Sequence, residues 1–415
     1  MDGPGAACHG GNLSATCAVP EAGAVPNRTT LTAAFAILLA VAAVLAQVCL
    51  VAANRFANLV DTPFLAYSLV GSFAIHFGTR PGRAERLITL GLAAAAAVAF
   101  VVASGRFRGD WPTSVATAGF LGLASLVVLG GQVFRLRGAE QDRKLRTLLA
   151  GSVFGFSALF IAVILKWTTT LHPRTYDLFL YAADAGYGLP ISRWVGQLVA
   201  AQGWLAWMCG LVYETLPLAV SLLYAYERNG SRPLPVPVLP AFLGGGAAAY
   251  LLYNLLPACG PHYVFGSAFP NAMPDSAAVK LVLAPVGEAA RNAVPSMHIA
   301  CAVLIWWSCE ALPRWVRWAA ALYLALTVLA TLGFGEHYVV DLVAALPYAM
   351  ALVAICNRRA GAAAVGVALT LAWLAALRFA TPLFESVAFT WAATLATIGT
   401  VVAWRWNAHR GRALR

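Results

Sequence analysis

Residues 295–341 begin with Pro295-Ser296-Met297-His298 and end with Gly335-Glu336-His337-Tyr338-Val339-Val340-Asp341. Two apolar runs and a short basic turn separate these polar ends. An ionisable side chain loses its hydration in hydrocarbon, so histidine and aspartate at the edges of apolar runs need partners or a wet cavity. The stretch therefore predicts a catalytic site at the ends of apolar helices.

The composition of the whole chain indicates which solvent surrounds these helices. Of the 415 residues, 60% are hydrophobic and 11% are charged, and the mean hydropathy is +0.74. Soluble domains carry roughly 25% charged residues, so this chain has too little polar surface to coat a soluble globule of its length. We expect a polytopic membrane protein.

Apolar runs recur along the chain, and a run of about 17–25 residues can cross a hydrocarbon core roughly 30 Å thick as a helix. A backbone in lipid must satisfy its own hydrogen bonds, which favours helices over open sheets. We expect an all-α fold of about 12 transmembrane helices. They are expected near residues 30–53, 58–77, 86–105, 113–134, 145–166, 203–226, 236–256, 295–312, 315–334, 337–356, 361–380 and 386–404.

Three segments lack the pattern of a spanning helix. Residues 1–29 are rich in glycine, alanine and proline and predict a flexible tail, and residues 405–415 predict a basic tail. Residues 167–202 mix aromatic and charged side chains, which is typical of a helix in the membrane interface. Asp177 and Asp184 in this segment would share one helix face, where they could bind a polar headgroup or remain hydrated.

The basic residues predict an orientation, because short cytoplasmic loops accumulate lysine and arginine. In a twelve-span chain the side that holds both termini carries 19 of the 28 basic residues, and the other side carries 9. We therefore expect cytoplasmic termini and a site on the non-cytoplasmic face. The net charge of +11 is spread in short clusters between spans, which does not indicate a nucleic-acid-binding protein.

The four-residue spacing of His337 and Asp341 places both on one face of a helix, where the carboxylate can accept the imidazole N–H. An imidazole held in this way has a fixed tautomer and a free nucleophilic nitrogen. His298 could then supply a proton to a leaving oxygen. The candidates to bind phosphoryl oxygens on the same side are Arg291, Lys280 and the backbone N–H groups beside Ser296.

Other interpretations remain open. The two histidines and Asp341 could together hold zinc, although we expect neither a metal nor a cofactor, or the histidines could anchor helix ends at the interface. A chain of about 12 helices is also the plan of many secondary transporters, in which two of the three ionisable residues Asp61, His76 and Glu214 could line a path. Carriers are built from internal repeats, and neither histidine motif recurs in the first half of the chain.

Pro295-Ser296-Met297-His298 resembles the Pro-Ser-x-His second motif of the type 2 phosphatidic acid phosphatase superfamily, and residues 335–341 resemble the His-x-x-x-Asp half of its third motif. The resemblance implies a six-helix catalytic core, here residues 145–356, between accessory helices in 30–134 and 361–404. It implies that His337 is the nucleophile that takes the phosphoryl group, that Asp341 orients it, and that His298 protonates the leaving group. Ser296 would contact the phosphate.

Two motifs of that superfamily are missing. In place of the Lys-x6-Arg-Pro first motif, Lys280 and Arg291 are eleven residues apart and Asn292 follows the arginine. Ala330 and Thr331 stand where the third motif has Ser-Arg. These departures leave Arg291 as the main candidate cation.

The same departures resemble the branch of inositol phosphorylceramide synthases and sphingomyelin synthases, which move a phospho-headgroup between lipids. Residues 253–261 and 176–184 also look like that branch. The resemblance implies a phosphotransferase of lipid metabolism, with a lipid phosphate or phospholipid as donor and a lipid hydroxyl as acceptor. Asp177, Asp184 and Tyr338 are the candidates to contact the headgroup or acceptor. A simple lipid or polyprenyl phosphate phosphatase is the alternative.

Overall fold

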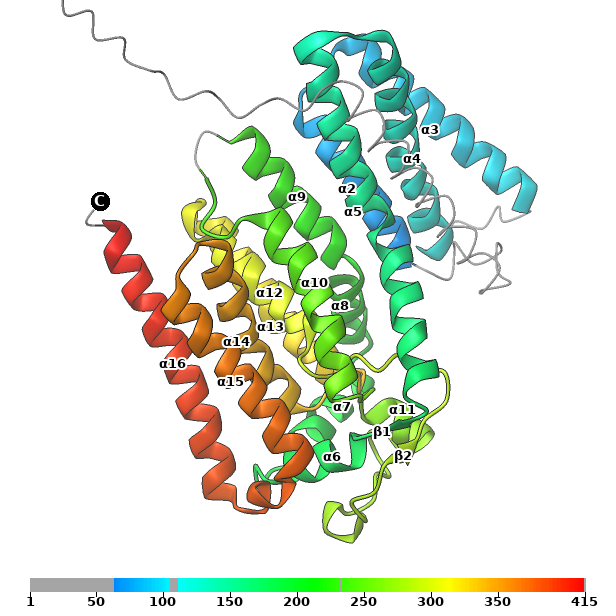
Figure 1. Cartoon of the computed structure of the whole chain (residues 1–415). Coiled ribbons are helices and arrows are strands. Elements are labelled where there is room, and N and C mark those ends of the chain that lie inside the picture. The colour runs from blue at the N-terminus through cyan, green and yellow to red at the C-terminus, as the bar shows by residue number, and fades with distance from the viewer. Residues whose placement is uncertain (1–62, 105–110, 231–232, 414–415) are drawn as a thin grey trace, which may run out of the picture. The chain divides into compact units, whose positions relative to one another are not determined.

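A computed structural model describes residues 63–104, 111–230 and 233–413, and the fold is that of these residues (Figure 1). They form helices and one two-stranded antiparallel sheet. The all-α class expected from the sequence is confirmed for this part of the chain. The expected tail 1–29 and the first expected span, 30–53, lie outside the described residues.

The elements follow one another closely along the chain. The helices are α2 (Pro63–Gly78), α3 (Arg83–Ser104), α4 (Trp111–Arg135), α5 (Gly138–Leu171), α6 (Asp177–Ala185), α7 (Ile191–Ala201), α8 (Gly203–Glu214), α9 (Leu216–Asn229), α10 (Val238–Leu255), α11 (Pro261–Phe265), α12 (Met297–Ser308), α13 (Arg314–Gly333), α14 (Val339–Cys356), α15 (Ala360–Phe379) and α16 (Val387–Ala413). The 3₁₀ turns are η2 (Gly266–Ala268), η3 (Ser276–Ala278), η4 (Cys309–Ala311) and η5 (Thr381–Glu385), and the strands are β1 (Arg174–Thr175) and β2 (Ala284–Pro285).

Seven described helices are long and apolar enough to cross a membrane, namely α3, α4, α10, α13, α14, α15 and α16. The pair α7 and α8 would add an eighth span, although a bend of 110° separates its two helices. These helices support an integral membrane protein, but the count of about 12 expected from hydropathy is not confirmed. One reason is that α8 ends at Glu214, so the expected span 203–226 is divided into two shorter helices.

Helices α2 to α5 form a bundle with α9, in which α2 packs against α4, α5 and α9, and α3 packs against α4. At Gly122 of α4 an added Cβ would lie 1.9 Å from the carbonyl oxygen of Leu69, so only glycine allows α2 this close. The carboxylate of Glu85 accepts hydrogen bonds from Lys144 Nζ and lies 2.7 Å from His76 Nε2. His76, which the sequence suggested for a solute path, is thus paired inside this bundle.

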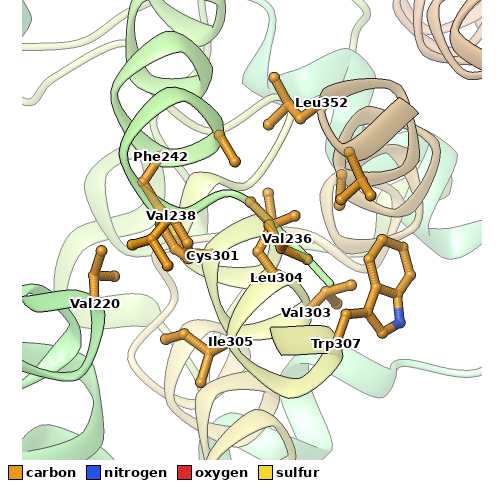
Figure 2. Close-up of a cluster of buried hydrophobic side chains, with 14 of the residues drawn as sticks. Val220, Val236, Val238, Phe242, Cys301, Val303, Leu304, Ile305, Trp307 and Leu352 are labelled. Atoms are coloured by element: carbon orange, nitrogen blue, oxygen red, sulfur yellow. The ribbon is translucent and has the colours of Figure 1, made fainter. Parts of the chain in front are cut away.

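The hydrophobic core of the second half surrounds α12. Figure 2 shows Val220 of α9, Phe242 of α10 and Leu352 of α14 gathered around Cys301 and neighbouring side chains of α12. Most side chains of α12 and α14 are buried, and α14 also packs against α15 and α16. The two helices that carry His298 and Asp341 are therefore central, and their first turns are held by surrounding elements.

The segment 167–202, expected as one interfacial helix, contains the end of α5, strand β1 and the short helices α6 and α7. Gly188 between α6 and α7 has φ +69°, a left-handed conformation that glycine adopts without strain, and Pro190 two residues later precedes α7. Strand β1 pairs with β2, which ties this segment to the loop before α12.

Helix α16 continues through Arg405 to Ala413, where the sequence predicted a tail from residue 405. Arg405 is buried and forms an ion pair with Glu310, and its guanidinium lies over the ring of Trp307. These contacts explain why the helix extends beyond the apolar run.

Candidate active site

His337 lies in the connection between α13 and α14 and is 2% exposed. The backbone amides of Glu336 and His337 both donate to the carbonyl of Thr331, at 3.0 and 3.2 Å, and so close the end of α13. Gly335 has φ +70°, and an added Cβ would lie within 3 Å of Phe269 and His262. The glycine therefore permits the tight turn that presents His337.

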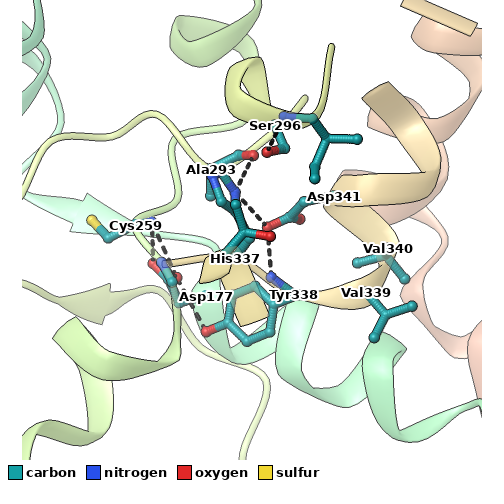
Figure 3. A network of polar contacts seen from close by, with 12 residues as sticks. Asp177, Cys259, Ala293, Ser296, His337, Tyr338, Val339, Val340 and Asp341 are labelled. Carbon is teal, nitrogen blue, oxygen red and sulfur yellow. Dashed lines mark hydrogen bonds and ion pairs between the residues drawn. The ribbon is translucent and has the colours of Figure 1, made fainter. Parts of the chain in front are cut away.

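The imidazole of His337 has two oxygen neighbours on one edge (Figure 3). Its Nδ1 atom lies 3.0 Å from the carbonyl oxygen of Ala293 and 3.5 Å from Asp341 Oδ2. A carbonyl can only accept a hydrogen bond, so we assign the proton to Nδ1, which leaves the lone pair on Nε2. Burial lowers the pKa of His337 to about 4, against the opposing effect of Glu336. The imidazole is therefore neutral at neutral pH.

Asp341 is fully buried in the first turn of α14. Its Oδ2 accepts the backbone N–H of Tyr338 at 2.8 Å, and its Oδ1 has no hydrogen-bond partner in the described part of the chain. The sequence predicted the nearness of Asp341 to His337 but missed the Ala293 carbonyl. A backbone oxygen supplied by a preceding loop leaves no signal in the sequence.

His298 is the second residue of α12, and its ring centroid lies 6.2 Å from that of His337. On another side the His298 ring stacks on Tyr213 of α8, with centroids 3.9 Å apart and an interplanar angle of 18°. The structure thus brings together the two histidines that the sequence singled out. Tyr213 was not predicted, because α8 precedes α12 by more than eighty residues and carries no recognisable motif.

Ser296 is buried and caps α12. Its Oγ accepts the N–H of Ile299 at 3.4 Å, and its own N–H donates to the backbone carbonyl of Asp341 at 3.4 Å. The serine therefore caps α12 through its side chain, and its backbone N–H connects the start of α12 to the start of α14.

Arg291 is 1% exposed, and its guanidinium faces backbone carbonyls of its own loop and of the end of α5. The hydrogen bonds run from Nε to His172 at 2.8 Å, from Nη2 to Val286 at 2.8 Å, and from Nη1 to Gly287 at 3.0 Å and to Ala289. Lys280 lies exposed in the same loop. The guanidinium thus holds the loop, with at most one N–H left for another acceptor.

The α6 carboxylates are buried and hydrogen-bonded to the protein itself. Asp177 accepts the amides of Cys259 and Gly260 and the hydroxyl of Tyr338, whose oxygen lies 3.2 Å from Asp177 Oδ1 (Figure 3). Asp184 accepts the amides that begin α14 and the hydroxyl of Ser192. Burial raises the pKa of Asp177, and it raises the pKa of Asp184 to about 7.

Glu336, adjacent to the candidate nucleophile, accepts the hydroxyl of Tyr263 at 3.0 and 3.1 Å. Burial raises its pKa. Within residues 63–104, 111–230 and 233–413, no group of three or more His, Cys, Asp or Glu side chains is arranged to hold a metal ion.

The comparisons with known proteins bear on the second half of the chain. Neither the curated proteins nor the solved structures contain a match to this sequence. A family model does match, over a segment that contains both histidines and Asp341. The segment ends at the same residue as the catalytic core expected from the sequence, 356, but begins at 178 instead of 145. Residues 178–356 match the model of the PAP2 superfamily, and this match supports a phosphatase-type enzyme.

Proposed function

We propose that the protein is a membrane lipid-phosphate phosphotransferase or phosphatase that works through a phosphohistidine at His337. The observation that carries the proposal is the pairing of His337 with His298, 6.2 Å apart between ring centroids. The Ala293 carbonyl binds Nδ1–H of His337, so its Nε2 is the nucleophilic atom.

The reaction has two steps. In the first, His337 Nε2 attacks phosphorus and the bond from phosphorus to the leaving oxygen breaks. His298, which takes up a proton when the anionic phosphate binds beside it, gives that proton to the leaving oxygen. In the second, an acceptor hydroxyl attacks the phosphohistidine, His298 removes the hydroxyl proton, and the N–P bond breaks. Asp341 lies 3.5 Å from Nδ1 and stabilises the positive charge that develops on the imidazole.

We propose a phosphodiester donor, from which a phospho-headgroup of the phosphoinositol type passes to a lipid hydroxyl. A phosphomonoester carries about 1.5 to 2 negative charges at pH 7, whereas a diester carries one and needs fewer cations. Arg291 donates most of its N–H groups to backbone carbonyls, which favours the diester. The remaining N–H of Arg291, exposed Lys280 and the amides at the start of α12, beside Ser296, are the proposed phosphate contacts.

The proposed site faces the non-cytoplasmic side, and both termini are cytoplasmic. This orientation rests on the loop charges, with 19 basic residues on one side and 9 on the other. The helices outside residues 178–356 are accessory to the catalytic core in this proposal.

The test uses purified full-length protein in detergent and a panel of phospholipids, phosphatidic acid and polyprenyl phosphates, each with and without a lipid alcohol. Products are scored as free phosphate or as a new phosphodiester, and labelled enzyme is quenched in alkali to preserve phosphohistidine. His337→Ala should abolish turnover and labelling, and His172→Ala serves as a control histidine outside the proposed site. Release of phosphate alone would identify a simple phosphatase. Full turnover by His337→Ala would overturn the proposal.

A further inference from the structure

Helix α14 begins at Val339, two residues after His337. Its own Asp341 accepts the amide of Tyr338, whereas the amides of Val339 and Val340 take their acceptor from another helix. The N-terminal amides of a helix have no partner within the helix, and Ser, Thr, Asp or Asn at the N-cap position normally accepts one. Here that position is Tyr338. Asp184 of α6 replaces the missing cap, since its Oδ1 lies 2.7 Å from Val339 N and 3.3 Å from Val340 N.

Helix α6 also holds residues beside His337 through a second carboxylate, that of Asp177. Asp177 accepts the Tyr338 hydroxyl at 3.2 Å and the amides of Cys259 and Gly260 at 3.1 and 2.8 Å. Gly260 packs so closely on the turn before His337 that an added Cβ would lie 2.4 Å from the carbonyl oxygen of Glu336. Asp177 therefore fixes both Tyr338 and the loop that braces Glu336.

We propose that Asp184 and Asp177 are positioning residues for His337, and that α6 sets the direction in which Nε2 points. This inference rests on the proposed function of His337. Both carboxylates are buried. Asp184 accepts the backbone amide of Val339, two residues after His337. Asp177 accepts the side-chain hydroxyl of Tyr338, the residue next to His337. A misplacement of about 1 Å in a reacting group can cost about 10²-fold in rate.

Asp184 also affects where an anion can bind, because its carboxyl group lies at the N-terminus of α14. The N-terminus of a helix attracts anions through its free amides and its dipole. Asp184 occupies the first two amides of α14, so a phosphoryl group cannot bind there. The transferred group is thereby directed toward the start of α12, where His298 lies.

The experiment compares Asp184→Ala, Asp184→Asn and Asp177→Ala in the full-length protein. Asparagine keeps an oxygen for the two α14 amides and an N–H for Ser192 Oγ, and it removes the charge. Asp275→Ala is the matched control, since Asp275 also accepts a backbone amide at the start of a helical turn, in η3. The readouts are kcat, KM, the single-turnover rate of phosphohistidine formation and its final stoichiometry per folded protein.

We expect Asp184→Ala and Asp177→Ala to lower kcat and the labelling rate by about 10- to 100-fold, with KM within about threefold and unchanged final stoichiometry. Asp184→Asn should recover most of the rate. A loss of stoichiometry at an unchanged rate would show a merely structural role, and wild-type kinetics in Asp184→Ala would also overturn the inference. If His337→Ala keeps the turnover and labelling of the wild-type protein, the proposed function itself fails. A failure of the proposed function can therefore be distinguished from a failure of the positioning role alone.

Discussion

His337 Nδ1 lies 3.0 Å from the carbonyl oxygen of Ala293, and this carbonyl, rather than the carboxylate of Asp341 at 3.5 Å, makes the closest contact. The tautomer of the candidate nucleophile is therefore set by backbone from the loop before α12. Asp341 accepts the N–H of Tyr338 instead, and we expect its carboxylate to act on the imidazole from the greater distance. This division of roles makes specific predictions.

Replacement of Asp341 should separate its charge from its hydrogen bond. Asp341→Asn keeps an oxygen for the Tyr338 amide and should lower kcat by only about 10- to 100-fold, because the Ala293 carbonyl still holds Nδ1–H. Asp341→Ala should lower it further and also destabilise the fold by about 1 kcal/mol through the lost cap. Steady-state kinetics and thermal unfolding in detergent measure both effects. If Asp341→Asn were as inactive as His337→Ala, the Ala293 carbonyl would not hold the imidazole on its own, and this assignment of roles would be wrong.

Replacement of His298 should have an effect that depends on the leaving group. A lipid alkoxide needs a proton to leave, so His298→Ala should lower turnover of a natural donor by about 10²- to 10⁴-fold. A p-nitrophenyl ester leaves without that proton, so its turnover should fall far less. Parallel assays of both substrates measure the difference. Equal losses would show that His298 is not the acid, and Tyr213→Phe, which keeps the stacked ring, is the control for its placement.

The stability of the protein should depend on pH through His337. Its pKa is lowered from 6.5 to about 4 by burial, so between these values this imidazole binds more protons in the unfolded chain than in the folded protein. The contribution of His337 to stability should therefore fall as pH falls from about 6.5 to 4, whereas Asp184, whose pKa is raised to about 7 by burial, contributes with the opposite sign in both proteins. His337→Asn, which retains an N–H for the Ala293 carbonyl, should show a smaller decrease in melting temperature over that range. Identical slopes for both proteins would contradict the assignment.

Arg291 should contribute strongly to the stability of its loop. Arg291→Ala removes a buried guanidinium, leaves four partly buried carbonyls without donors and should lower the free energy of unfolding by about 2–4 kcal/mol. Arg291→Lys should not restore it, because an ammonium cannot reach carbonyls on several sides as the planar guanidinium does. Lys280→Ala, an exposed cation of the same loop, should change stability by at most about 0.5 kcal/mol. Wild-type stability of Arg291→Ala, with a raised KM alone, would favour a direct phosphate contact instead.

Most of the helices could be predicted from the sequence because each depends on a local property. A long apolar run in lipid must form a helix, and α13, α14 and α15 lie close to their expected ranges. The span expected at 203–226 was harder to predict, since its break near Thr215 and the 110° bend before α8 depend on packing. Hydropathy measures apolar length and carries no information on bends.

In the candidate site, too, some features could be predicted from the sequence and others could not. His298, His337 and Asp341 could be found because their spacing and their motifs are properties of the chain alone. The sequence suggested Asp177 and Asp184 as headgroup contacts, whereas their oxygens bind backbone amides and hydroxyls of the protein. Their helical spacing was visible, but the partners of their carboxylates were not.

The sequence by itself determined that this is an apolar, helical membrane chain with two histidines at helix starts, since composition and local spacing suffice for both. Only the tertiary structure decided that Ala293 holds the His337 imidazole, that Asp184 caps α14 and that Arg291 holds a loop. Asp184 and Val339 are 155 residues apart. Contacts over such separations arise when whole helices pack, and no local pattern of residues encodes which buried oxygen will meet which amide.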